Sequence, residues 1–239
     1  MLLDIKQLYG KKLGATDGDI GHVRDFYFDD QTWAIRYLVA DTGTWLPGRQ
    51  VLLTPHAFGA QAFGRSDADA EVLGVHLTRK QIEDAPSIET HLPVSRQYEE
   101  EYHRYYGWPG YWPGGDTWGM AGFPVVPVQP IPAPLPRPGN HPRDDIHLRS
   151  TTSVKGYEIR ASDGAIGSVS SFMVEGKGWM IRELVVETGH WYAGKKILLL
   201  PENITRISYE ESAVFVNLTR EDIQLTSKND VVQAGSGHR

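Results

Sequence analysis

The chain has 239 residues, of which 40% are hydrophobic, and a formal net charge of −6. This size and composition are typical of one large or two small globular domains and argue against a disordered chain. The absence of cysteine excludes disulfides, thiolate nucleophiles and sulfur-ligated metals. The negative charge argues against non-specific attraction to nucleic acid or to an anionic membrane, because both require a positive face.

Short strands are predicted through the first third of the chain. Residues 20–29, 32–42, 51–58 and 71–77 are rich in β-branched, aromatic and other apolar side chains, and Gly, Asp and Pro separate them. This pattern favours a small barrel or sandwich over a parallel sheet with crossover helices. Thr78 follows the last strand and is placed to cap a single helical turn.

The composition changes between residues 85 and 148. The stretch SRQYEEEYHRYYGW at 95–108 predicts a short helix with Tyr98, Tyr102 and Tyr105 on one face. Ten of the 15 prolines then lie between Pro109 and Pro142, which predicts an extended linker with no packed core.

The pattern of the first third returns after the linker. Residues 10–55 align with residues 156–201 without a gap, with 20 identities in 46 positions. The match resumes at LTRKQI (77–82) and LTREDI (218–223), after a difference of five residues in loop length. The chain therefore contains one unit of about 75 residues twice.

The strand at 34–40 carries apolar residues on both faces, with Ile35 and Val39 opposite Leu38 and Ala40. Its counterpart repeats this pattern, so each strand is expected to be covered on both sides. We expect one face to line the interior of its own unit and the other to pack against the second unit.

The repeated residues resemble the PRC-barrel family. The resemblance rests on the opening G-x-x-[LI]-x-x-x-D-G-x-[IL]-G-x-V, the strand W-x-I-R-x-L-V, and a closing strand VLLTP or ILLLP. It covers about residues 5–84 and 150–226. The family implies a small β-barrel, which also occurs in the photosynthetic reaction-centre H subunit and in a ribosome-maturation factor, and it acts by protein contact without a common catalytic residue.

The predicted fold class is therefore all-β, with two tandem small β-barrels that each end in a short helical turn. The first domain is expected over residues 1–84 and the second over 149–228. The proline- and aromatic-rich linker of residues 85–148 joins them, and residues 229–239 form a disordered tail. The N-terminal sequence shows no signal peptide, and no stretch of the sequence is an apolar run of membrane-spanning length, so a cytoplasmic location is expected.

Two repeated features have a structural and a functional interpretation. Asp17-Gly18 and Asp163-Gly164 have the chemistry of a tight hairpin turn, and the competing interpretation, a calcium loop, lacks its later glutamate. Arg36 and Arg182 recur together with acidic residues. We interpret them as structural ion pairs that fix strand register, and the alternative is an anion site.

No motif predicts catalysis, a bound metal or a cofactor. The stretch GHWYAGKK at 189–196 resembles a phosphate loop, but a strand follows it where a helix is required. The histidines show no metal-ligand spacing, and no G-x-S-x-G elbow is present. We therefore expect no enzymatic activity.

Tryptophan and tyrosine side chains are the candidate contacts to an unidentified protein partner, because these residue types anchor interfaces. The linker contributes Trp108, Tyr111, Trp112 and Trp118, and the turns of the two repeats contribute Trp45 and Trp191. The sequence thus predicts a non-catalytic interaction scaffold or adaptor. Two alternatives remain open: association with ribosomes or RNA, and ligand binding or catalysis in a pocket between the barrels.

Overall fold

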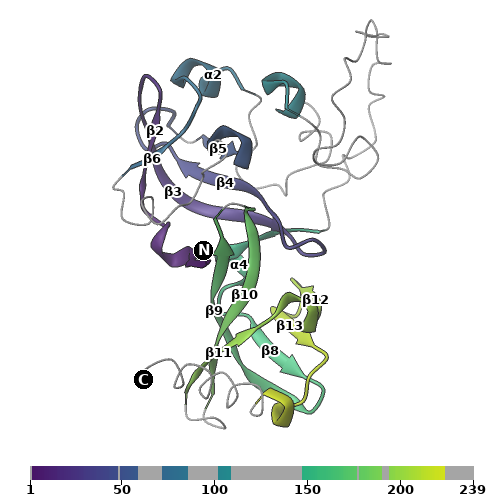
Figure 1. The fold of residues 1–239 in the computed structure, drawn as a ribbon. Helices are drawn as coiled ribbons and strands as arrows, with labels where there is room; N and C mark the ends of the chain where they lie inside the picture. Colours follow the sequence, from purple (N-terminus) through teal and green to yellow (C-terminus); the bar gives the residue numbers. More distant parts are fainter. Residues whose placement is uncertain are drawn as a thin grey trace, which may run out of the picture.

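Two β-sheets and a few short helices make up the described part of the chain in the computed structural model (Figure 1). The structure describes residues 2–47, 49–58, 72–85, 102–108, 147–176, 178–189 and 194–223. The expected proline linker and the C-terminal tail lie outside these residues. At this coarse level the prediction of a β-rich fold is confirmed.

The first sheet is built from the first repeat in the order β5-β4-β3-β2-β6. β2 and β6 are parallel, and the other neighbours in this order are antiparallel. The strands are β2 (Lys12–Ala15), β3 (Gly18–Asp29), β4 (Ile35–Asp41), β5 (Gln50–Leu53) and β6 (Val72–Gly74). The 3-10 helix η2 (Pro55–Phe58) follows β5.

A short helix, α2 (Arg79–Glu83), ends the first repeat. The Thr78 side chain accepts a hydrogen bond from the backbone of Gln81, whose side chain in turn accepts one from the Thr78 N–H. This capping box satisfies two of the amide groups that a helix N-terminus leaves without partners. The cap that the sequence predicted at Thr78 is therefore present.

The second sheet repeats this arrangement in the order β11-β10-β9-β8-β13-β12. Its strands are β8 (Glu158–Ala161), β9 (Gly164–Glu175), β10 (Met180–Thr188), β11 (Lys196–Leu199), β12 (Ile204–Ser208) and β13 (Ala213–Val216). The 3-10 helix η4 (Pro201–Asn203) leads into β12, a strand with no counterpart in the described part of the first repeat. β13 runs parallel to β8 as β6 does to β2.

The strand pairings among the described residues leave both sheets open. The path of the first sheet ends at β5 and β6, and that of the second ends at β11 and β12. Closure of either sheet into a barrel therefore remains a prediction.

The Asp-Gly turn contacts the helical residues that end each repeat, α2 in the first and residues 220–223 in the second. Asp17 accepts the backbone N–H of Arg79 at 2.7 Å, and Asp163 accepts that of Arg220 at 3.0 Å. Gly18 has φ +150° and is strained for other residues. The turn thus places a carboxylate at the helix start, where amide groups need acceptors.

The two halves share one apolar core. Phe28 stacks on Trp33, with ring centroids 5.5 Å apart, and lies 5.6 Å from Phe172 of the other half. Phe58 similarly lies 5.2 Å from Trp179. A continuous cluster of buried side chains therefore runs from the first sheet into the second, and the hydrophobic effect holds the halves together as well as each half by itself.

A glycine-to-alanine pair tests the local geometry of β3. A Cβ atom at Gly21, whose φ is +132°, would lie 1.9 Å from the Asp41 carbonyl oxygen. We expect Gly21→Ala to lower the free energy of unfolding by at least about 2 kcal/mol, because the neighbouring strand β4 must move. Urea denaturation measures the change.

Gly74→Ala is the matched control, because a Cβ there meets nothing within 4 Å. Its effect should stay within about 0.5 kcal/mol. Equal stability of the two variants would contradict the close approach of β3 and β4.

Candidate functional site

The junction between the halves is formed by a reciprocal exchange of strands. β1 (Leu2–Asp4), at the N-terminus, pairs with β9 of the second repeat, whereas β7 (Leu148–Ser150) pairs with β3 of the first. Leu2 lies opposite Glu175, and Leu148 lies opposite Asp29 in the equivalent register. Figure 1 shows the N-terminus between the two halves. Each repeat therefore completes the sheet of the other.

The centre of the junction is a pair of interlocked turns. The Ile35 N–H donates to the Trp179 carbonyl at 2.7 Å, and the Ile181 N–H donates to the Trp33 carbonyl at 2.8 Å. Ala34 and Met180 form a bridge between these bonds. Trp33 and Trp179 have φ values of +62° and +51°. Such conformations cost about 1–3 kcal/mol for non-glycine residues, so the contact between halves must offset them.

A buried hydroxyl network joins the segment after β7 to β3. Thr151 is fully buried at the start of α4 (Thr151–Val154). Its hydroxyl lies 2.9 Å from the Asp25 carboxylate and 2.8 Å from the Tyr9 hydroxyl. Because a carboxylate only accepts, Thr151 donates to Asp25 and accepts from Tyr9. Burial raises the pKa of Tyr9, which keeps this donor protonated.

Two equivalent hydrogen bonds at the junction each join a serine to an aspartate, but the serine and the aspartate exchange positions between them. The Ser171 hydroxyl donates to Asp4, and the Ser150 hydroxyl donates to Asp25. Asp4 and Ser150 hold equivalent positions in the repeat, as do Asp25 and Ser171. Pairing of two first repeats would therefore place Asp4 against Asp25, and the two carboxylates would repel each other. The arrangement favours one first repeat with one second repeat.

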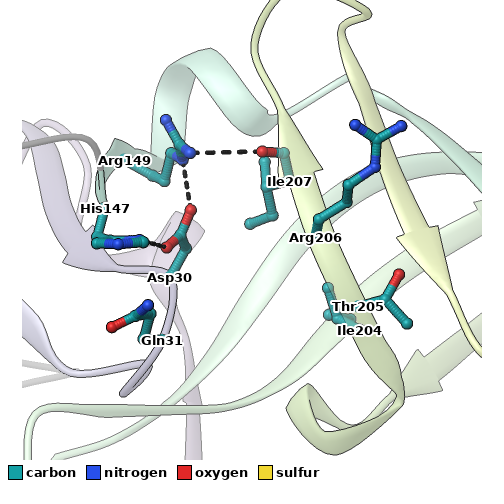
Figure 2. Close-up of a pocket in the computed structure, with 8 residues that line it drawn as sticks. All are labelled: Asp30, Gln31, His147, Arg149, Ile204, Thr205, Arg206 and Ile207. Carbon is teal, nitrogen blue, oxygen red and sulfur yellow. Dashed lines mark hydrogen bonds and ion pairs between the residues drawn. The ribbon is translucent and has the colours of Figure 1, made fainter.

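A groove of about 340 Å³ opens beside this junction (Figure 2). Its walls are Asp30, Gln31, His147 and Arg149 on one side and residues 204–207 of β12 on the other. Asp30 accepts the Arg149 Nε–H at 2.7 Å and lies 2.9 Å from His147 Nδ1. The Arg149 guanidinium also donates to the Ile207 carbonyl at 3.4 Å, which links the two walls.

The second arginine of the groove is also ion-paired. Arg206 lies 2.8 Å from Glu211, and its guanidinium lies 3.9 Å from the Phe215 ring centroid. The Thr205 hydroxyl donates to the Phe215 carbonyl at 3.1 Å. These contacts hold β12, which forms one wall of the groove.

An aromatic segment of the linker covers the outer face of the first sheet. Residues 102–106 form a helical turn, and Tyr102 is 1% exposed, with its hydroxyl donating to the Leu52 carbonyl. Its ring lies edge-on to Tyr37, with centroids 6.1 Å apart. Trp108 stacks on Tyr106, with centroids 4.4 Å apart. We call residues 102–108 the aromatic cap.

The aromatic candidates from the sequence fall into two groups. Trp45 is half-buried against the core, with the Arg79 guanidinium 4.6 Å from its ring centroid. Trp108 belongs to the aromatic cap and is half-buried. The other four lie outside the described residues, and they are Tyr111, Trp112, Trp118 and Trp191.

The turn and charge candidates have these partners. Asp17 and Asp163 face the helix starts described above, and Gly18 and Gly164 lie beside Arg79 and Arg220. Arg36 pairs with Asp29 at 3.6 Å, and both side chains are buried. Arg182 pairs with Glu175 at the equivalent position, where the side chains are partly exposed. Each of the two arginines therefore has a carboxylate partner in its own repeat.

Sequence reasoning missed the strands that the halves exchange and the network around Thr151. Residues 2–4 and 148–150 share one identity in three positions, Leu2 and Leu148. Their equal distance from the shared glycines Gly10 and Gly156 is the available signal, and it indicates equivalence but not which sheet each strand joins. The additional strand β12 was also missed.

No known family model matches the chain, and no curated protein matches its sequence. Among the described residues, no group of three or more His, Cys, Asp or Glu side chains is placed to hold a metal ion. None of the described helices has the length and apolar character needed to cross a membrane.

Replacing the buried hydroxyl tests the junction. Thr151→Val keeps the side-chain shape but removes the acceptor of the Tyr9 hydroxyl and the buried hydroxyl that donates to Asp25. We expect a loss of about 2–3 kcal/mol in the free energy of unfolding, measured by urea denaturation. Thr152→Val is the control, because Thr152 bonds the same carboxylate from an exposed position. An equal effect of the two substitutions would contradict a buried network.

The aromatic cap predicts a dependence of stability on alkaline pH. Burial, then the neighbouring Tyr105, raises the pKa of Tyr106 above its ordinary value of 10.0. The neutral hydroxyl therefore stabilises the fold fully below pH 10, and this contribution is lost as the pH rises toward the folded-state pKa. Tyr106→Phe should reduce the fall in stability above pH 10 in urea denaturation. Tyr209→Phe, at an exposed position, is the control. An equal reduction in the fall of stability by this control would contradict the assignment of the pH dependence to Tyr106.

Proposed function

We propose that the protein is a non-catalytic adaptor, built from two tandem PRC-barrel-like units that are joined into one body and present surfaces to partner proteins. The partner is a protein, and the adaptor needs no cofactor. The cytoplasmic location expected from the sequence is part of this proposal.

The proposal rests on a difference in exposure between equivalent surfaces of the two repeats. Leu198 in the edge strand β11 of the second repeat is 49% exposed, Leu200 just after this strand is 45% exposed, and Tyr209 nearby in the chain is 71% exposed. The equivalent surface of the first repeat is covered by the aromatic cap. Exposed apolar groups on a sheet edge are typical of a surface that another chain covers.

The pairing of the polar residues supports a role in protein contact over a catalytic role. Arg36, Arg149, Arg182 and Arg206 are each paired with a carboxylate, and the Thr151 hydroxyl is committed to Asp25 and Tyr9. Such pairs hold the halves and strands in register. This use of charge favours a scaffold.

The groove beside the junction favours a second function, the binding of a small polar ligand. Its volume of about 340 Å³ is at the lower end for ligand pockets. Because Asp30, Arg149 and Arg206 are already ion-paired there, a charged ligand would have to compete with these contacts. Association with RNA is less favoured, because the net charge is −6.

Capture from native cell lysate tests the adaptor. The immobilised full chain should retain a protein partner in nearly equal molar amount. A Trp112→Ala, Trp118→Ala double variant should retain less of it, because tryptophan side chains anchor interfaces. This variant keeps Tyr102 and Trp108, so the aromatic cap is preserved.

Quantitative gel analysis and mass spectrometry provide the measurement, and thermal unfolding confirms that both proteins are folded. Recovery of no protein above the level of a blank resin would contradict the adaptor function. Equal recovery by both proteins would keep the adaptor and remove these two tryptophans from the interface.

A further inference from the structure

The two repeats differ in exposure at the outer face of their edge strands. Among the described strands, β5 and β11 each pair on one side only. Leu52 of β5 is 3% exposed and its equivalent Leu198 is 49% exposed. Thr54 is 1% exposed and its equivalent Leu200 is 45% exposed. The same structural position is therefore covered in one half and open in the other.

The aromatic cap accounts for the covered side. Tyr102 packs with Tyr37, Val39 and Leu52 in a small cluster separate from the main core. Its hydroxyl donates to the Leu52 carbonyl at the sheet edge. The cap thus supplies an aromatic ring for the apolar face and one hydrogen bond for the strand.

The exposed face of the second repeat presents groups that match those beneath the aromatic cap. Val39 lies opposite Leu52, and in the matching register Val185 lies opposite Leu198. The Leu198 carbonyl therefore stands at the edge position that the Leu52 carbonyl holds. Glu183 occupies the place of Tyr37 and is half-buried. An occupant of this face therefore needs an apolar ring, a hydroxyl donor and a basic group beside them.

We propose that the exposed Leu198 and Leu200, with the buried Val185 opposite Leu198, form a docking face for a short tyrosine-bearing helical segment of a partner protein. The tyrosine ring covers the leucines, its hydroxyl donates to the Leu198 carbonyl, and an adjacent Arg or His pairs with Glu183. This inference rests on the proposed adaptor function. The cap of a second copy is not the occupant, because Tyr102 is already buried on its own first sheet.

A labelled variant of the full chain tests the face. The chain lacks cysteine, so Lys196→Cys, on the exposed face of β11 two residues before Leu198, creates a single attachment site. An environment-sensitive dye on this residue reports on what covers the face. The probe is a synthetic peptide of residues 98–108, YEEEYHRYYGW, which contains Tyr102, His103 and Arg104.

We expect a saturable blue shift of the dye emission when the peptide is added. Leu198→Asp in the labelled chain should weaken binding by about tenfold or more, because it replaces a buried leucine contact with a charge. A peptide with Tyr102→Phe should bind several-fold more weakly, because it lacks the hydroxyl donor. Dye on Val72→Cys, at a position 42% exposed in the first repeat, is the control and should not respond.

Three results would overturn the docking face. They are an absent response at residue 196, an affinity unchanged by Leu198→Asp, and self-association of the chain that Leu198→Asp abolishes. The third result would assign the face to a second copy. Lysate capture by the intact chain, combined with any of these results, would reject the docking face and leave the adaptor function standing. A dye response with no captured partner would support the face and count against the adaptor function.

Discussion

The reciprocal exchange of β1 and β7 is the constraint on which the rest of the structure depends. Each strand comes from one repeat and completes the sheet of the other, with Leu2 opposite Glu175 and Leu148 opposite Asp29. The exchange brings the turns at Trp33 and Trp179 together, places Thr151 beside Asp25, and forms the walls of the groove. Neither half keeps its full set of strand partners without the other. The hydrogen bonds and the shared apolar core therefore make the two repeats a single structural unit.

Small differences between the repeats make the two halves of the molecule unequal. Asp4 and Ser150 hold equivalent places but have opposite roles in their hydrogen bonds, so the halves are complementary and not identical. The first repeat receives the aromatic cap on its outer face, whereas the second repeat leaves Leu198 and Leu200 open. A symmetric pair thus acquires one covered and one uncovered sheet edge. Such an arrangement would suit the adaptor function that we propose.

Local structure could be predicted from the sequence, whereas the long-range pairing of strands could not. Turn chemistry at Asp17-Gly18, the cap at Thr78 and the strand content follow from short-range rules, since they depend on neighbours within a few residues. The pairing of β1 with β9 joins residues more than 160 positions apart, and a three-residue strand has too little pattern to choose its partner. Burial of Tyr102 on Leu52 was equally invisible, because a tyrosine-rich helix shows which face is apolar but not what covers it.

The strand exchange is tested most directly by engineered disulfides in this cysteine-free chain. Directly opposite residues of antiparallel strands are close enough for a disulfide, so Leu2→Cys with Glu175→Cys should form one under mild oxidation. Leu148→Cys with Glu175→Cys is the matched pair, and it links these positions only if each repeat keeps its own strand. Mass spectrometry of proteolytic fragments from the monomer should find the first link and not the second. The opposite result would contradict the exchange and, with it, the shared junction.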